Sequence, residues 1–400
     1  MFALRLFTFL LAFVVLSITV SIGAGLSVAD TAYAQSIGGK IVYTADALDT
    51  NEDGVIDATD NDIMFSIEIG ADPATDRFRI AGGPPASAAY PRLTDDAKFV
   101  LCHAFTDTDG DGVIDHQKDM PFVAILGADG ADLTPLTMPG NDVSLEANFS
   151  PDEKSIVFTR ATADTDGDGQ VTINDTRQLA IKPLGVLNAD APKASDFADD
   201  SEPMILTDDD ITVSRPQFWT ETMVLFEARR LSDDRLGVYV YDLEQGTMTR
   251  ISPEDMDATN PQISPDGTQI VMQVAAEAGS RIWVYDAAAE TLNDVTPLEG
   301  SASDASWSPD GSTLAMVVAS ADTSDLVLYD GSTTDVLVTE QGVISMTAFA
   351  PDGESIAYAL TTDETTSLNV VSLDQAFMAK LTPDDTRLVE FVWSPDEKGT

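Results

Sequence analysis

Three short segments of the chain carry aspartate or asparagine at every second position, with glycines between them. They are DTNEDGVIDATD (Asp49 to Asp60), DTDGDGVIDHQKD (Asp107 to Asp119) and DTDGDGQVTIND (Asp164 to Asp175). This alternation brings several carboxylate and amide oxygens to one side of a tight turn. Hard divalent cations bind through such oxygens, so the chemistry that these residues offer is metal binding.

The spacing matches a 12-residue calcium loop, in which side-chain oxygens come from positions 1, 3, 5, 9 and 12, a backbone carbonyl from position 7, and position 6 is glycine. The predicted ligands are Asp49, Asn51, Asp53, Val55, Asp57 and Asp60 in the first loop, Asp107, Asp109, Asp111, Val113, Asp115 and Asp119 in the second, and Asp164, Asp166, Asp168, Gln170 and Asp175 in the third. The second loop is the least regular, because Lys118 stands at position 12 and Asp119 follows one residue late.

A simpler interpretation is that these Asp-Gly clusters are solvated hairpin turns without an ion. Against it, the first ligands of the three loops lie 58 and 57 residues apart, and each loop keeps the glycine at position 6. Clustered carboxylates repel one another unless a cation neutralises them. The recurrence therefore favours up to three calcium ions. Magnesium fits less well because it gives up its waters reluctantly.

The loops are carried by a repeat whose copies share one layout: an apolar residue, a Pro-Asp turn and an alternating apolar strand. The copies are FSPDEKSIVF from Phe149, ISPDGTQIVM from Ile263, WSPDGSTLAM from Trp307, FAPDGESIAY from Phe349 and WSPDEKGT from Trp393. Proline presets φ and the following residues tolerate turn geometry, so each copy predicts a β-hairpin.

A third strand such as GVYVYDL (from Gly237) or RIWVYDA (from Arg281) follows each hairpin, and a shorter fourth strand follows that. Four antiparallel strands every ~40–45 residues are typical of propeller blades. Inner strands are expected near Tyr90, Leu145, Val213, Asn260, Ala302 and Ser345. Residues 37–82 lack an inner strand, and RLVEFVWSPDE (from Arg387) has no blade after it. The pattern predicts an all-β, seven-bladed β-propeller over residues 35–400, in which the C-terminal strand completes the first blade.

The SPDG-type turns and the VYD strands resemble those of the TolB-like β-propeller family, across nearly all of residues 35–400. The resemblance implies the fold and little about function. Propellers of related type also precede the hydrolase domain of prolyl-oligopeptidase-type peptidases, but this sequence has no Gly-x-Ser-x-Gly motif.

The three Asp loops resemble those of EF-hand proteins and, because they end with aspartate, those of dockerins. Strands rather than helices are expected on both sides: IVFTRA leads into the third loop and RQLAIK leaves it. All three loops should therefore join the second and third strands of the first three blades. They would form an arc on the face opposite the SPDG turns.

Composition excludes several classes of partner. The chain has 68 acidic and 21 basic residues, a formal charge of −47, so nucleic acid and anionic lipid surfaces would be repelled. The single cysteine, Cys102, lies in an apolar run and excludes an intrachain disulfide; we expect a buried thiol. We expect a monomer.

Residues 1–34 read as an export signal. Arg5 precedes the apolar stretch from Leu6 to Val20, and Ala32 and Ala34 provide the small residues that a signal peptidase reads, giving a mature start at Gln35. An uncleaved membrane anchor is the alternative. The protein is thus expected to be exported, whether periplasmic, cell-surface or extracellular.

These features favour an exported, calcium-binding interaction module for a protein or carbohydrate ligand at the cell envelope, rather than an enzyme. One alternative is a propeller-type polysaccharide lyase or hydrolase, for which two histidines (His103 and His116) are few. Another is the accessory propeller of a peptidase system. No catalytic residue is predicted.

Overall fold

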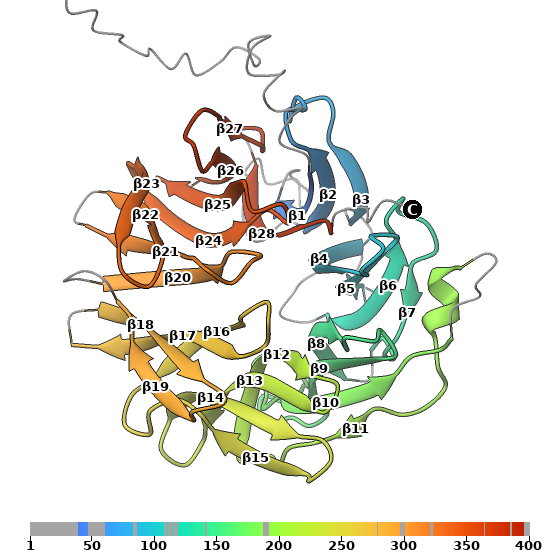
Figure 1. The fold of residues 1–400 in the computed structure, drawn as a ribbon. Coiled ribbons are helices and arrows are strands. Elements are labelled where there is room, and N and C mark those ends of the chain that lie inside the picture. Colours follow the sequence, from blue (N-terminus) through green and yellow to red (C-terminus); the bar gives the residue numbers. More distant parts are fainter. Residues whose placement is uncertain are drawn as a thin grey trace, which may run out of the picture.

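A computed structural model describes residues 39–395, except 47–60, 83–85, 108–109, 111–113, 115–118, 141, 187–191, 278, 297–300, 321–322, 364 and 385. Over these residues the strands form seven antiparallel sheets of four strands each. Figure 1 shows the sheets as blades arranged around one axis, in chain order around the ring. The predicted seven-bladed β-propeller is confirmed.

Blade 1 contains β28 (Arg387–Trp393), β1 (Lys40–Asp46), β2 (Ile63–Glu68) and β3 (Phe78–Gly82). Blade 2 contains β4 (Ala86–Leu93), β5 (Phe99–Thr106), β6 (Phe122–Gly127) and β7 (Thr134–Pro135). Blade 3 contains β8 (Val143–Phe149), β9 (Ser155–Ala161), β10 (Gln178–Pro183) and β11 (Met204–Ile205).

Blade 4 contains β12 (Ile211–Thr220), β13 (Met223–Arg230), β14 (Arg235–Asp242) and β15 (Thr247–Arg250). Blade 5 contains β16 (Ala258–Ile263), β17 (Gln269–Ala276), β18 (Gly279–Asp286) and β19 (Thr291–Asp294). Blade 6 contains β20 (Ser301–Trp307), β21 (Leu314–Ala319), β22 (Ser324–Tyr329) and β23 (Thr334–Glu340). Blade 7 contains β24 (Val343–Phe349), β25 (Ser355–Thr362), β26 (Thr365–Ser372) and β27 (Met378–Lys380).

The ring closes through blade 1, where the last strand of the chain pairs with the first. β28 runs antiparallel to β1, with Ile41 opposite Trp393 and Tyr43 opposite Phe391. The pairing joins distant parts of the chain and covers the edge that each strand would otherwise expose. The predicted completion of the first blade by the C-terminal strand is therefore confirmed.

Apolar side chains fill the space between neighbouring blades, because second and third strands are buried on both faces. One cluster joins blades 7 and 1 and includes Ala357, Leu368, Ile41 and Trp393. Another joins blades 1 and 2 and includes Met64, Ile80 and Cys102. Burial raises the pKa of the Cys102 thiol to about 12, so this cysteine is the buried structural thiol that its apolar run predicts.

Each inner strand carries a β-bulge at the same place. The register against the next strand shifts between Ala89 and Arg92 in β4, between Leu145 and Asn148 in β8, and at matching points in β12, β16, β20 and β24. The first extra residue in each has a positive φ: Tyr90, Glu146, Arg215, Asn260, Asp304 and Met346. In β28 the shift falls at Val389. Bulges of this kind re-aim one side chain per strand.

An insertion between β10 and β12 packs against blades 2 and 3. Its described part contains a short 3-10 helix, Ala194–Phe197. Phe197 is buried and its ring lies 5.1 Å from that of Phe99 in the neighbouring blade. Ala194 and Phe197 pack this segment against blades 2 and 3.

None of the helices in the described part of the chain has the length and hydropathy to cross a membrane. The predicted signal segment, residues 1–34, lies outside the described residues.

Candidate metal centre

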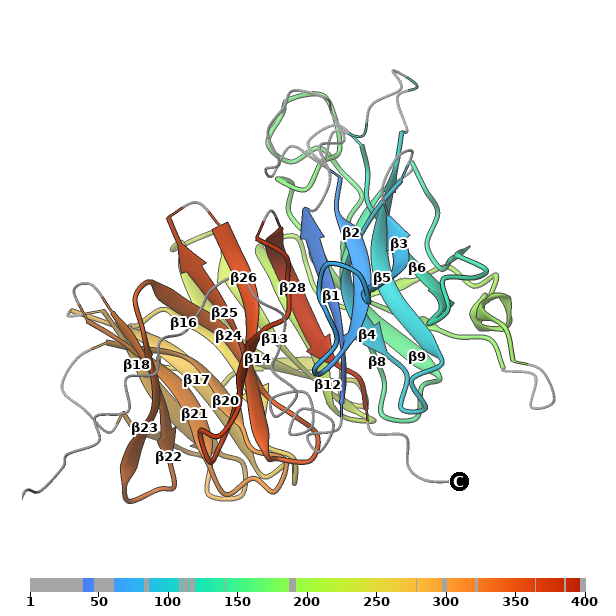
Figure 2. The ribbon, with the colours of Figure 1, turned by 90° about the horizontal axis from the view of Figure 1, so that it is seen from above.

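The third Asp loop joins β9 to β10, the second and third strands of blade 3, as predicted. β9 and β10 pair up to Arg160 opposite Gln178, so the loop starts and ends on a continuous sheet. In Figure 2 the green loop that follows β9 stands above the upper edge of the ring, on the side where β1 to β6 lie. Val171, at position 8 of the loop, packs against Val143 and Leu145 at the base.

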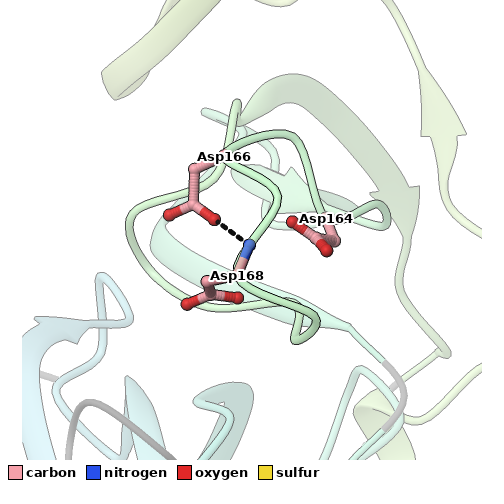
Figure 3. Close-up of side chains that lie close together, drawn as sticks. All are labelled: Asp164, Asp166 and Asp168. Atoms are coloured by element: carbon pink, nitrogen blue, oxygen red, sulfur yellow. Dashed lines mark hydrogen bonds between the residues drawn. The ribbon is translucent and has the colours of Figure 1, made fainter.

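Asp164, Asp166 and Asp168 converge in this loop. One carboxylate oxygen from each lies within 4.8 Å of the others, and all three side chains are exposed. Figure 3 shows the three carboxylates gathered around one turn of the loop. These are positions 1, 3 and 5 of the predicted calcium loop, so the structure brings together the first three of its ligands.

Backbone amides hold the three carboxylates in place. Asp164 accepts hydrogen bonds from the amides of Gly167 (2.6 Å) and Gly169 (2.8 Å). Asp166 accepts from the amide of Asp168 at 3.1 Å, and Asp168 accepts from the amide of Gln170 at 2.9 Å. Each donor lies two to five residues after its acceptor, so the chain folds back around the aspartates. Amides lower the cost of gathering negative charge without neutralising it.

Two glycines make this path possible. Gly167 and Gly169 have φ of +82° and +96°, and an added Cβ at either would meet nothing within 4 Å. The need for glycine is therefore conformational rather than steric. Gly169 is the position 6 glycine of the predicted loop.

Asp175, predicted as the acid at position 12, does not join the cluster. Its carboxylate is 1% exposed and faces the backbone. It accepts the amides of Thr172 (2.7 Å), Thr165 (2.5 Å) and Asp166 (3.3 Å), together with the Thr165 hydroxyl (2.9 Å). Burial acts to raise the pKa of Asp175, but these hydrogen bonds outweigh it and hold the pKa below its usual range. In this structure Asp175 closes the loop.

The second Asp loop is described only in part. The amide of Gly110 donates to Asp107 at 2.6 Å, the same bond that Gly167 gives Asp164. Ile114 at position 8 is buried, and Asp119 is buried as well. The first loop lies outside the described residues. The predicted ligands that cannot be placed are Asp49, Asn51, Asp53, Val55, Asp57, Asp60, Asp109, Asp111, Val113 and Asp115.

A second group of polar residues lies at the channel between blades 1, 2 and 3, and the sequence reasoning missed it. A cavity of about 320 Å³ is lined there by Asp46, Asp62, Tyr90, His103, Phe105, Leu145, Glu146, Ile173, Arg177, Arg387 and Val389. His103 is buried, and its ring centre lies 4.4 Å from that of Tyr90. The bulges that place Tyr90 and Glu146 leave no mark in the sequence.

Charges in this cavity are partly paired. Arg387 contacts Asp46 at 2.8 Å, and burial together with the neighbouring Asp46 carboxylate raises the pKa of Asp62. Burial and then the carboxylates of Glu390, Asp62 and Glu146 raise the pKa of Tyr90. The phenol of Tyr90 therefore stays neutral in a ring of acids.

Comparison with known proteins supports the fold. Residues 205–397 match the family model described as the TolB beta propeller domain, PD40. This match spans blades 4 to 7 and β28, and blades 1 to 3 repeat the same four-stranded architecture. No curated protein sequence matches it significantly.

Solved structures of similar fold include TolB from Acinetobacter baumannii, 14% identical, with a TM-score of 0.49 over 84% of this chain and 80% of that one. An oligogalacturonate lyase in complex with manganese is 15% identical, with a TM-score of 0.55 over 87% and 86%. A puromycin-hydrolyzing peptidase from Mycobacterium tuberculosis is 13% identical, with a TM-score of 0.59 over 89% of this chain and 55% of the peptidase. At these identities the likeness to the lyase and the peptidase shows the fold alone.

These neighbours correct one prediction. The sequence predicts an interaction module rather than an enzyme, yet structures of the same fold include a lyase and a peptidase. The prediction rested on the few histidines and the missing Gly-x-Ser-x-Gly motif, which test two particular chemistries and not catalysis in general. The fold is compatible with enzymes and with binding proteins, and enzymatic activity is not established.

Proposed function

We propose that the protein is an exported, calcium-binding β-propeller that acts as an interaction module for a protein or carbohydrate ligand at the cell envelope. The observation that supports calcium binding is the convergence of Asp164, Asp166 and Asp168 at positions 1, 3 and 5 of a calcium-type loop. Three carboxylates this close repel one another in the absence of a cation. A bound divalent ion would remove that repulsion and order the loop.

Calcium suits the loop better than magnesium. The donors are carboxylate oxygens on a glycine-containing loop, and calcium accepts six to eight oxygens in a flexible geometry. Asp164, Asp166 and Asp168 would hold the ion, with the Gln170 carbonyl and waters as further ligands. Asp175 would keep its place against the backbone or rotate to the ion. The predicted sites around Asp49 and Asp107 would bring the number of ions to as many as three.

Export is the second part of the proposal, and residues 1–34 support it. An apolar stretch followed by Ala32 and Ala34 is typical of a cleaved signal peptide. Outside the cytoplasm, millimolar calcium suffices for weak sites of the extracellular kind, with dissociation constants of about 10⁻⁴–10⁻³ M.

The experiment that tests calcium binding is a calorimetric titration of the purified protein, paired with melting curves in calcium and in chelator. Binding of one to three ions and a higher melting temperature in calcium are expected. If no heat of binding is measured and the melting temperatures in calcium and in chelator are equal, the Asp loops are solvated turns without an ion. Magnesium at the same concentration is the matched control and should give a smaller shift.

A further inference from the structure

The cavity at the channel between blades 1, 2 and 3 has the make-up of a small-molecule site. Its volume, about 320 Å³, lies at the lower end of the range of about 300–1,000 Å³ that such sites occupy. Tyr90, Glu146 and Val389 reach it from the bulges of three neighbouring inner strands, β4, β8 and β28. Three strands distant in sequence thus aim side chains at one space.

Arg177 is the residue of this cavity that most directly indicates a ligand. Its Nε atom is buried and has no hydrogen-bond partner in the described part of the chain, and no ion pair of its guanidinium is found among the same residues. In a chain with 68 acidic and 21 basic residues, an arginine without a carboxylate is unexpected. An unmet buried donor that lines a cavity calls for an acceptor from a ligand.

The charges around Arg177 restrict what that acceptor can be. Asp46, Asp62 and Glu146 line the same cavity, so an anion would meet three acids in a protein of charge −47. A cation would instead meet Arg177 and Arg387. A neutral ligand that both donates and accepts hydrogen bonds satisfies both sets of groups.

Tyr90 adds an apolar face to this arrangement. Tyr90 is 40% exposed and its ring packs against that of His103, with ring centres 4.4 Å apart. Sugars combine hydroxyls that donate and accept with C–H faces that pack on aromatic rings. We propose that this cavity binds a neutral saccharide unit, with a ring hydroxyl accepting from Arg177, hydroxyls donating to Glu146 and Asp62, and the sugar ring against Tyr90.

The cavity is also tied to the Asp loops. Asp46 and Asp62 stand on either side of the first loop, and Phe105 precedes the second. Ile173 lies within the third loop and Arg177 directly before β10, so ordering this loop fixes Arg177. Saccharide binding should therefore strengthen when calcium fills the loops. This coupling rests on the proposed calcium binding, whereas the cavity does not.

The test measures the binding of neutral sugars to the full protein by calorimetry and ligand-observed NMR, in calcium and in chelator. The probes are glucose, galactose, N-acetylglucosamine, cellobiose and chitobiose, with galacturonate as the charged counterpart. At least one neutral probe should bind in calcium, and galacturonate should bind at least tenfold more weakly. Failure of all neutral probes, or preference for galacturonate, would overturn the ligand class.

Variants locate the site. Arg177→Met keeps the packing of the side chain and removes its donors, so affinity should fall about tenfold or more. Arg229→Met is the matched control: Arg229 pairs with Asp234 on blade 4 and does not line the cavity, so its loss should leave affinity unchanged. Equal effects of the two substitutions would overturn the assignment of the cavity. Circular dichroism and melting curves confirm that both variants fold.

Three results separate the cavity, the calcium function and the coupling between them. Sugar binding of equal strength in calcium and in chelator, in a protein that calorimetry shows to bind calcium, would overturn the coupling alone. No calcium binding with intact sugar binding would overturn the proposed calcium function and support the cavity. Calcium binding with no sugar binding would overturn the cavity and support the calcium function.

Discussion

The third Asp loop and the SPDG turns use aspartate in opposite ways. In the turn that follows β16, the Asp266 carboxylate accepts the Ser264 hydroxyl at 2.7 Å and the Thr268 amide at 3.0 Å. Asp310 does the same with Ser308 and Ser312. Each of these carboxylates thus accepts several hydrogen bonds from donors in its own turn. In the Asp loop three carboxylates share their space with one another.

The difference teaches where a cation can act. An aspartate that caps a turn is satisfied by protein donors and gains little from an ion. Aspartates that converge carry a repulsion that backbone amides reduce without cancelling. The same residue is therefore structural at one end of the blades and available for metal at the other. Substitutions at matched positions should separate the two roles.

The largest effect is expected from removing charge at the convergence. In the variant Asp164→Asn, Asp166→Asn, Asp168→Asn, the calcium-dependent part of the stability from this site should vanish, about 2.7 kcal/mol at a hundredfold excess over Kd. In chelator the variant should melt at or above the temperature of the parent, because its repulsion is gone. Differential scanning calorimetry in both conditions measures this.

The control for this variant is Asp266→Asn in an SPDG turn. It should lower stability by the same amount with and without calcium, since Asp266 has no other carboxylate beside it in the turn. An identical calcium-induced rise in the parent and the triple variant would contradict metal binding at the third loop. Any ions at the first two loops contribute equally to both proteins and do not affect the comparison.

A smaller effect, independent of calcium, is expected at Asp175. Asp175→Ala removes the acceptor of three backbone amides in a buried place, and unmet donors of this kind cost about 1–3 kcal/mol. Urea unfolding should show the same loss in calcium and in chelator. The exposed neighbour Asn174→Ala is the control. A loss seen only in calcium would mean that Asp175 turns to the ion, as position 12 of the loop predicts.

The sequence predicted the blades well and the site only in part. Pro-Asp-Gly turns and alternating strands are local signals, so the blade count and the ring closure could be read from them. One turn was not predicted because it has no proline. Thr94 to Lys98 folds as the SPDG turns do, with the Ala97 amide donating to the Thr94 carbonyl at 2.8 Å. The cavity was not predicted because it depends on the bulges of three strands that are distant in sequence, and no local sequence pattern encodes these bulges.

Position 12 shows the same limit within a motif. Spacing predicted Asp175 as a ligand because it counts residues along the chain. The structure has this carboxylate turned to the amides of Thr165 and Thr172, which compete for its oxygens at closer range. Spacing determines which residues can reach a site, and local hydrogen bonds determine which of them face it.

Glycine-to-alanine substitutions compare the backbone of the third Asp loop with that of an SPDG turn. Gly169→Ala should cost about 1–2 kcal/mol, because φ of +96° lies outside the region that alanine tolerates. Gly267→Ala should cost less, since Ala97 and Glu153 occupy the matching turn position with φ of 55° and 54°. Urea unfolding of the two variants in chelator measures the difference. Equal costs would mean that the Asp loop adapts its path without difficulty.

The smallest effect concerns the charge state of a capping aspartate. The hydrogen bond from the Ser308 hydroxyl, followed by those from Ser312, lowers the pKa of Asp310 to about 2. A carboxyl whose pKa is lower in the folded state favours folding above the unfolded pKa, near 4, and this contribution is lost as the pH falls through about 2. Carboxyl NMR shifts should follow this titration, with the same midpoint in calcium and in chelator. Ser308→Ala should move the midpoint upward. A midpoint that moves with calcium would instead place an ion at the turn, and the separation between capping and converging aspartates would fail.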